Sequence, residues 1–263
     1  MINFAAIVPH PPFLIPNVGK NHLPKLKKTL AAFELLEKKL QETHIDTIIM
    51  ISPHGDLANE LLAINTRQNY EINFEKFGDF ATKMEIEADL GIINKLKSSN
   101  ETYLPIQLFS EQNLDHGISV PLFHLLKNKK NYRLVPINYN TNDQEMLFAF
   151  GEALKEASFD SPKRVAIILS GDLSHRLAYD SPHGFSPQAK EFDKKIIQLL
   201  KKNNLENFKN IDGKMIQEAL PCLFPGLYIL LGALAKMNCQ FEILNYEAPF
   251  GVGYLLGNFN FNG

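Results

Sequence analysis

The stretch DTIIMISPHGD, residues 46–56, decides the fold of this 263-residue chain. Its first seven residues are mostly apolar and β-branched, which is typical of a strand buried on both faces of a parallel sheet. The apolar run ends at Ser52, and a Pro-His-Gly turn follows. Two other runs have the same character, INFAAIV at 2–8 and VAIILS at 165–170. Together the three runs predict the centre of a buried sheet.

Segments of helical period alternate with these strands, which is the pattern of an α/β fold. We expect helices at 23–41, 88–98, from 116, at 143–157 and 187–202, and in pieces up to about 235, with further strands at 103–109, 132–137, 240–246 and 251–259. Residues 61–66 and 70–74 alternate like antiparallel strands, with 67–69 as the turn between them. We therefore predict one domain over residues 1–263, an α/β/α sandwich with a mixed, mostly parallel sheet.

Composition excludes several classes of protein. Lys and Arg total 27 against 29 for Asp and Glu, and four of the basic residues are Arg, so we expect no nucleic-acid partner. The longest apolar stretch, 227–235, is far shorter than the roughly 20 residues that span a bilayer, so we expect no membrane insertion. The Pro-interrupted amino-terminal segment is a poor signal peptide, and two cysteines are too few for a disulfide framework. These features favour the cytoplasm.

Histidines follow the predicted buried strands. His10 comes after the first run, His54 after the second and His175 after the third. Because loops from the carboxyl ends of parallel strands meet in one crevice, these three imidazoles are candidates for a shared site. His116 lies in a loop that starts a predicted helix, beside Asp115. Asp172 is placed either to orient the His175 ring or to cap a turn.

The pattern favours a metal site, because imidazole is the commonest protein metal ligand and such sites take about three protein ligands. Cys222 stands before an apolar helix, where the helix dipole would lower its pKa and favour thiolate. Glu218 and Glu247 are carboxylate alternatives for the third ligand, and Cys239 is expected in the core. A cysteine hydrolase that uses Cys222 with a histidine is a rival, although two Pro-His strand ends argue against it.

Five motifs in order along nearly the whole chain resemble one known family. They are VPHPP at 8–12, SPHGD at 52–56, LDHGISVPL at 114–122, SGDLSHR at 170–176 and PFGVGYLLG at 249–257. This pattern is similar to the LigB-like superfamily of class III extradiol dioxygenases, and within it to the branch of the Memo and AmmeMemoRadiSam proteins.

The resemblance implies a commonly dimeric α/β sandwich with a mononuclear metal centre. In dioxygenases of this superfamily, two histidines and a glutamate hold Fe(II), and the protein cleaves a catechol-type aromatic with O₂. Carried over by motif, His10 and His54 match the metal ligands, and His116 and His175 match the catalytic histidines that handle protons. Cys222 stands where the glutamate is expected, as in the Memo branch, and thiolate shifts metal preference toward copper, zinc or a differently tuned iron. The alternative function is therefore a metal-binding protein without dioxygenase activity, acting in a redox or radical-enzyme pathway.

Overall fold

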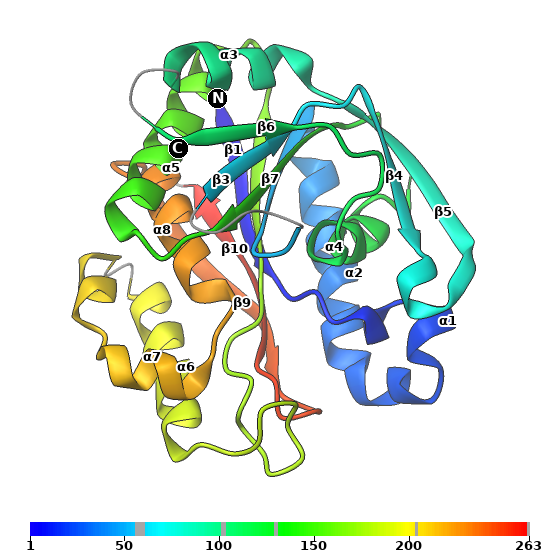
Figure 1. Cartoon of the computed structure of the whole chain (residues 1–263), viewed down its shortest axis with the longest axis vertical. Helices are drawn as coiled ribbons and strands as arrows, with labels where there is room; N and C mark the ends of the chain where they lie inside the picture. Colours follow the sequence, from blue (N-terminus) through cyan, green and yellow to red (C-terminus); the bar gives the residue numbers. More distant parts are fainter. Residues whose placement is uncertain (56–60, 101–103, 129–130, 203–204, 262–263) are drawn as a thin grey trace.

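One mixed sheet organises the molecule. The computed structural model describes residues 1–55, 61–100, 104–128, 131–202 and 205–261, and within them ten strands form this sheet (Figure 1). Their order is β4-β5-β7-β2-β8-β1-β10-β9, with β3 and β6 off this path. The strands are β1 (Ile2–Val8), β2 (Thr47–Ser52), β3 (Leu61–Asn65), β4 (Asn69–Phe74), β5 (Asp79–Ala88), β6 (Ile106–Phe109), β7 (Arg133–Asn140), β8 (Val165–Ser170), β9 (Cys239–Glu247) and β10 (Tyr254–Phe261).

The four central strands, β7, β2, β8 and β1, are parallel to one another. Every residue of β2 and β8 is buried, which explains their continuous apolar sequences. Since the four strands run the same way, their carboxyl ends lie along one edge of the sheet. The predicted fold, a single α/β domain with a mixed, mostly parallel sheet, is confirmed.

Antiparallel strands complete both sides of this parallel centre. β10 pairs with the free edge of β1, so the first strand lies between β8 and β10, and β9 pairs with β10. On the other side, β7 shares its outer edge between two partners. β5 runs parallel to its first two residues, and β3 runs antiparallel to its last four. β6 pairs in parallel with β3.

Helices cover both faces of the sheet. α2 and α4 pack together on one side, and α5 and α8 on the other, where α3 also contacts α5 (Figure 1). The backbones of α5 and α8 lie in close contact. A Cβ atom added to Gly232 in α8 would lie only 2.0 Å from the carbonyl oxygen of Phe148 in α5. The helices are α1 (Pro16–Gly19), α2 (Lys27–Glu42), α3 (Leu90–Asn100), α4 (His116–Leu125), α5 (Gln144–Phe159), α6 (Pro187–Lys201), α7 (Gly213–Ala219) and α8 (Leu223–Leu234).

Two details of the predicted secondary structure are wrong. Residues 61–65 and 69–74 are strands, but they do not pair as a hairpin, because β3 pairs with β6 and β7 while β4 pairs with β5. The strand β5 was not predicted at all, because its exposed positions include charged side chains, such as Lys83 and Glu85, that resemble a solvated loop. The expected strand at 103–109 is β6, beginning at Ile106, and residue 103 lies outside the described residues.

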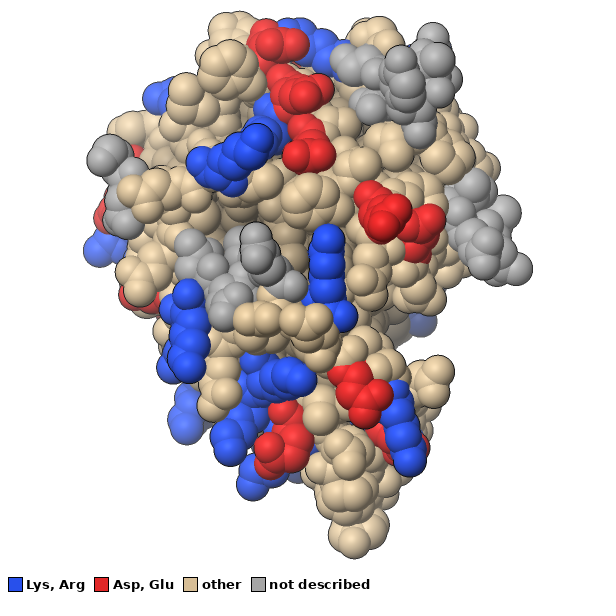
Figure 2. All heavy atoms as spheres, turned by 90° about the vertical axis from the view of Figure 1, so that its left-hand side faces the viewer, with Lys and Arg blue, Asp and Glu red and all other residues tan. Residues whose placement is uncertain are grey.

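None of the helices in the described ranges is long and apolar enough to cross a membrane. Figure 2 shows the face on the left of Figure 1, where Lys and Arg side chains are interspersed with Asp and Glu.

Candidate metal centre

Three side chains from distant parts of the sequence converge at the carboxyl edge of the sheet. Nε2 of His10 lies 3.0 Å from Nε2 of His54 and 3.7 Å from Sγ of Cys222. One potential ligand atom from each residue lies within 4.8 Å of the others, and the described residues contain no other group of this kind. His10 and His54 follow β1 and β2, and Cys222 is the N-cap of α8. The cluster therefore forms where the carboxyl ends of β1 and β2 meet the amino end of α8.

The ring of His10 is fixed from the neighbouring strand. Its Nδ1 atom lies 2.9 Å from Oγ of Ser170, the last residue of β8, and its backbone N–H donates to Oδ1 of Asp172 at 3.3 Å. The residue is 3% exposed. Because Nδ1 contacts the Ser170 hydroxyl group, Nε2 faces His54 and Cys222. A hydrogen bond to one ring nitrogen orients metal-binding imidazoles in the same way.

His116 joins the two ligand candidates from the first residue of α4. The centroid of the His116 ring lies 4.2 Å from that of His54 and 5.3 Å from that of His10. The centroid of the Phe77 ring lies 5.6 Å from that of His116. The His10 and His54 ring centroids are 4.7 Å apart. The structure thus brings together three of the histidines that were predicted to share a site.

His175 lies in the loop after β8, close enough to His10 and His54 to influence their pKa values. Its Nδ1–H group donates to the carbonyl oxygen of Leu220 at 2.7 Å, which leaves Nε2 as the acceptor nitrogen. Leu220 lies just before Cys222, so one loop orients both side chains. The ring of the exposed residue His183 lies 6.0 Å from that of His175.

Burial keeps the site imidazoles neutral. It lowers the pKa of His10 well below its usual value, and the charges of His54, His116 and His175 lower it further. The pKa of His54 is about 4, again mainly because of burial and then because of His116 and His175. Burial is also the main cause of the lowered pKa values of His116 and His175. At neutral pH these rings carry lone pairs, which is the state that binds metal or accepts a proton.

Cys222 does not behave as its position before a helix predicted. Burial, and next the charge of Asp172, raise the pKa of its thiol above the usual value, so the expected lowering by the helix is wrong. The loss of hydration outweighs the helix dipole at this buried position. The sulfur accepts the backbone N–H of Asp172 at 3.1 Å, and the Tyr139 hydroxyl donates to the Cys222 carbonyl oxygen at 2.9 Å. A bound cation is the usual means of stabilising thiolate in such a setting.

The Asp172 carboxylate lies against His10, whereas one of its two predicted roles was to orient the ring of His175. Oδ2 of Asp172 lies 3.9 Å from Nε2 of His10, whereas the His175 ring is oriented by the carbonyl group of Leu220. Burial raises the pKa of Asp172 to about 7, and the backbone N–H of His10 opposes this rise. The predicted role in orienting His175 is therefore wrong, because the loop turns this side chain back toward β1.

The two glutamates kept as alternative ligands have other partners. Glu218 accepts a hydrogen bond from Arg176 at 3.0 Å. Glu247 accepts from the Thr29 hydroxyl at 2.6 Å and from the Thr29 backbone N–H at 3.0 Å. Cys239 is buried in β9, at 3% exposure. Among the three candidates for the third position, Cys222 is the one that the structure places with the histidine pair.

Sequence reasoning missed the polar residues that hold the site histidines. Ser52 and Ser170 end two otherwise apolar strands, and each contacts a site histidine, Ser52 through its hydroxyl oxygen and the His54 backbone N–H at 3.1 Å. Asn138 pairs with Ser52 across β2 and β7 and donates to the His54 carbonyl oxygen. For the two serines, the signal was a polar residue at the last position of a buried strand.

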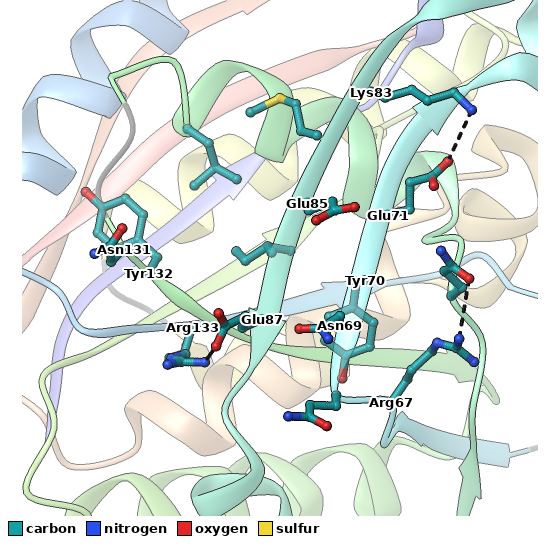
Figure 3. A pocket seen from close by; sticks show the side chains of 15 residues that line it. Arg67, Asn69, Tyr70, Glu71, Lys83, Glu85, Glu87, Asn131, Tyr132 and Arg133 are labelled. Carbon is teal, nitrogen blue, oxygen red and sulfur yellow. Dashed lines mark hydrogen bonds and ion pairs between the residues drawn. The ribbon is translucent and has the colours of Figure 1, made fainter.

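A large groove lies in another part of the molecule. It measures about 1380 Å³ and runs along β4 and β5 to Arg133, the first residue of β7, which lies at the amino edge of the parallel strands (Figure 3). Its charged side chains are largely paired, Lys83 with Glu71 and Arg133 with Glu87. None of the site histidines lines this groove, so the groove does not compete with the histidine cluster as the candidate centre.

The chain is similar to several known proteins. The chain is 31% identical to Protein CA_C1420 of Clostridium acetobutylicum over 96% of its length, and it spans 56% of that relative. It is 21% identical to the 2-aminophenol 1,6-dioxygenase beta subunit of Pseudomonas sp, covering 97% of this chain and 92% of that one. The crystal structure of the uncharacterized protein JW3007 from Escherichia coli K12 has the same fold, with a TM-score of 0.68 at 15% identity, covering 97% of this chain and 98% of that one.

A family model described as the catalytic LigB subunit of aromatic ring-opening dioxygenase matches residues 4–257. This match includes all five motifs and every residue of the histidine and cysteine cluster. The chain therefore belongs to the LigB family.

Proposed function

We propose that the chain is a metal-dependent extradiol ring-cleavage dioxygenase that acts on a catechol-type aromatic with O₂. The observation that carries this proposal is the meeting of His10, His54 and His116 at the carboxyl edge of the sheet in a LigB family member. One relative is named for 2-aminophenol, an aromatic with adjacent hydroxyl and amino groups, so we include this compound among the candidate substrates.

The donor set fits a single metal ion held by His10, His54 and Cys222. Bonds of about 2.1 Å to nitrogen and about 2.3 Å to sulfur allow a nitrogen and a sulfur ligand to lie up to about 4.4 Å apart. Two nitrogen ligands can lie up to about 4.2 Å apart by the same reasoning. The His10–His54 separation of 3.0 Å and the His10–Cys222 separation of 3.7 Å fall within these limits. Fe(II) is the first choice because of the family, while the thiolate also suits copper or zinc.

The protein's own groups would bind and deprotonate the substrate. A bound metal would polarise the substrate oxygens and hold the reactants together. His175, whose Nδ1–H is committed to Leu220, presents Nε2 as a proton acceptor, and His116 lies beside the ligand pair on the other side. Both imidazoles have lowered pKa values, so each is neutral at pH 7 and ready to accept a phenol proton.

The decisive experiment begins with metal analysis of protein purified anaerobically without an affinity tag. Fe(II)-loaded protein is then mixed with catechol or 2-aminophenol, and O₂ uptake is recorded. We expect uptake by the parent chain, and loss of uptake with retained iron in His175→Asn and His116→Asn. An iron-loaded parent that consumes no O₂ with either compound would overturn the proposal, and loss of iron in both variants would reverse the assigned roles.

Cys222 favours a second candidate, a Memo-like metal protein without dioxygenase activity. The residue lies with His10 and His54, whereas Glu218 and Glu247 form hydrogen bonds elsewhere, which supports a thiolate in place of the glutamate of the dioxygenases. If this candidate is right, the purified protein contains copper, zinc or iron and consumes no O₂. Cys222→Glu should then gain catechol cleavage relative to the parent when loaded with Fe(II).

We also propose that the chain forms a homodimer, as the family resemblance implies. Light scattering during size-exclusion chromatography should give twice the monomer mass of 29.8 kDa. A single peak at the monomer mass would contradict this.

A further inference from the structure

Asp115, the N-cap of α4, links three elements through one carboxylate. It accepts the backbone N–H of Ile118 at 3.3 Å, the Ser52 hydroxyl at 2.7 Å and the Asn138 amide at 2.8 Å. Ser52 and Asn138 are cross-strand neighbours at the carboxyl ends of β2 and β7. The carboxylate therefore joins the start of a helix to the ends of two parallel strands.

The same two donors also hold the backbone of His54. The Ser52 hydroxyl oxygen accepts the His54 N–H at 3.1 Å, and the Asn138 amide donates to the His54 carbonyl oxygen. Both backbone polar groups of His54 are thus bound by side chains that Asp115 orients. A hydroxyl group has one proton and an amide two, so the direction of each bond depends on an acceptor at Asp115.

His116 is fixed from the same point, because it directly follows Asp115 in the chain. The helix start is packed closely against the His54 loop. A Cβ on Gly117 would lie 2.3 Å from Ser52 Oγ and 3.2 Å from Cδ2 of His54. The 4.2 Å separation of the His54 and His116 rings follows from this packing.

We infer that Asp115 is a positioning residue, which sets the direction of His54 toward the metal and the spacing between His54 and His116. The inference rests on the proposed metal site. Outer-shell partners of metal ligands typically change affinity by 10- to 100-fold when they are removed. Asp115 acts on His54 through one intervening side chain on each side, Ser52 or Asn138, and so it acts on both backbone polar groups of His54 at once.

Two substitutions test this role. Asp115→Asn places an amide N–H group against the Asn138 amide, so one of the two must turn. If Asn138 turns, the His54 carbonyl group loses its donor, and if the new amide turns, the Ser52 hydroxyl and the Ile118 N–H lose their acceptor. Ser52→Ala removes a single oxygen atom and leaves Asp115 in place. The control is Asp143→Asn, at the N-cap of α5. Within the described residues, the Asp143 carboxylate accepts one hydrogen bond, from the Met146 backbone N–H at 3.0 Å.

The measurement is a titration of metal-free protein with Co²⁺, followed by its ligand-field and thiolate absorption bands, with thermal unfolding as a check on the fold. We expect Asp115→Asn and Ser52→Ala to weaken Co²⁺ binding by at least about tenfold and to shift the ligand-field bands. Asp143→Asn should change neither, and should change the melting temperature little, because an Asn side-chain oxygen caps a helix about as well as Asp. If Asp115→Asn does not fold, Ser52→Ala alone decides.

The outcomes separate this inference from the proposed function. A parent chain that binds no Co²⁺ overturns the metal site itself. A parent that binds Co²⁺, with both variants folded and unchanged in affinity and spectrum, overturns the role of Asp115. Equal losses in the variants and in Asp143→Asn would show general destabilisation, and would also overturn it.

Discussion

The sulfur of Cys222 lies among groups that carry no positive charge, with a backbone N–H as its hydrogen-bond donor and a neutral imidazole 3.7 Å away. This setting stabilises a thiolate poorly on its own, as the raised pKa of the thiol shows. A cation between Cys222, His10 and His54 would supply the missing positive charge, so the three residues act as one unit.

Cys222→Ser should therefore weaken Zn²⁺ binding by at least about tenfold, because a hydroxyl group is a poorer ligand than a thiolate for this metal. Isothermal titration calorimetry on metal-free protein measures the effect. The control is Cys239→Ala, at a buried position in β9, which should retain the affinity of the parent. Equal affinities for the parent and Cys222→Ser would remove the thiol from the site.

At this scale the sequence predicted that histidines gather at one edge of the sheet, because buried strands end visibly in the sequence and their loops share that edge. The structure brings His10, His54 and His116 together there, while the roles assigned to the histidines stay predictions. It did not predict the partner of Asp172. The side chain of a loop residue can turn toward any neighbouring strand, and in this loop it turns back to His10.

The helix α4 combines site and core in ten residues. Its first turn carries His116 and Gly117 against the His54 loop, while its far end places His124 beside the ring of Phe33, 4.8 Å away at 29°. Substitutions in the first turn of α4 should therefore affect metal binding, whereas substitutions at His124 should affect the stability of the core.

Gly117→Ala should damage the site more than the fold. The added Cβ would lie 2.3 Å from Ser52 Oγ, so either the helix start or Ser52 must move away from His54. We expect a loss of stability of roughly 1–3 kcal/mol together with weaker metal binding. Gly213→Ala, at the start of α7 where a Cβ meets nothing within 4 Å, is the matched control and should change neither. Unaltered metal affinity in a folded Gly117→Ala protein would contradict the packing argument.

His124 should make the fold sensitive to acid. Burial, and next the charge of Lys127, lower its pKa to about 3, whereas an unfolded histidine has a pKa near 6.5. The stabilisation is thus complete above pH 6.5 and is lost as pH falls toward 3, because the unfolded state takes up the proton first. The loss can reach roughly 5 kcal/mol. Urea unfolding of the parent and of His124→Leu at pH 7 and pH 5 measures the difference. Equal pH dependence of the two proteins would exclude His124 as the cause.

Strands with continuous apolar sequences were predicted within about one residue, whereas the β3–β5 region was not. Runs such as 165–170 carry their own signal, because both faces are buried. β4 pairs with the next strand along the chain, β5, which is largely exposed, and β5 joins the rest of the sheet through two residues that pair with the distant strand β7. The short connection at 67–69 favours a hairpin locally, but the free edge of β7 binds β3 instead.

On the scale of the whole molecule, the metal-ligand candidates come from residues 10, 54 and 222, on three separate elements of one buried sheet and its covering helices. The core around them is extensive and apolar, and α8 is held against α5 by backbone contact at Gly232. The fold is therefore expected to exist without the metal, unlike small domains in which metal ligands replace a core.

Chelation should remove the metal without unfolding the chain. We expect the far-ultraviolet circular dichroism spectrum to be unchanged after dialysis against a chelator, while the melting temperature falls, since metal binds the native state alone. Readdition of the metal should restore the original melting temperature. Loss of the dichroism signal on chelation would show that the metal supports the whole fold.

The place of β1 between β8 and β10 has a consequence for biosynthesis. β1 precedes both of its partners in the chain, so one edge of β1 stays unpaired until β8 has been synthesised and the other until β10 has been synthesised. The nascent chain therefore carries an apolar segment without its partners over this interval. Chaperone contact during synthesis should therefore concentrate on residues 2–8. A fragment of residues 1–238, which stops before β9, should remain unfolded and aggregate, and a cooperative unfolding transition in that fragment would contradict this order of assembly.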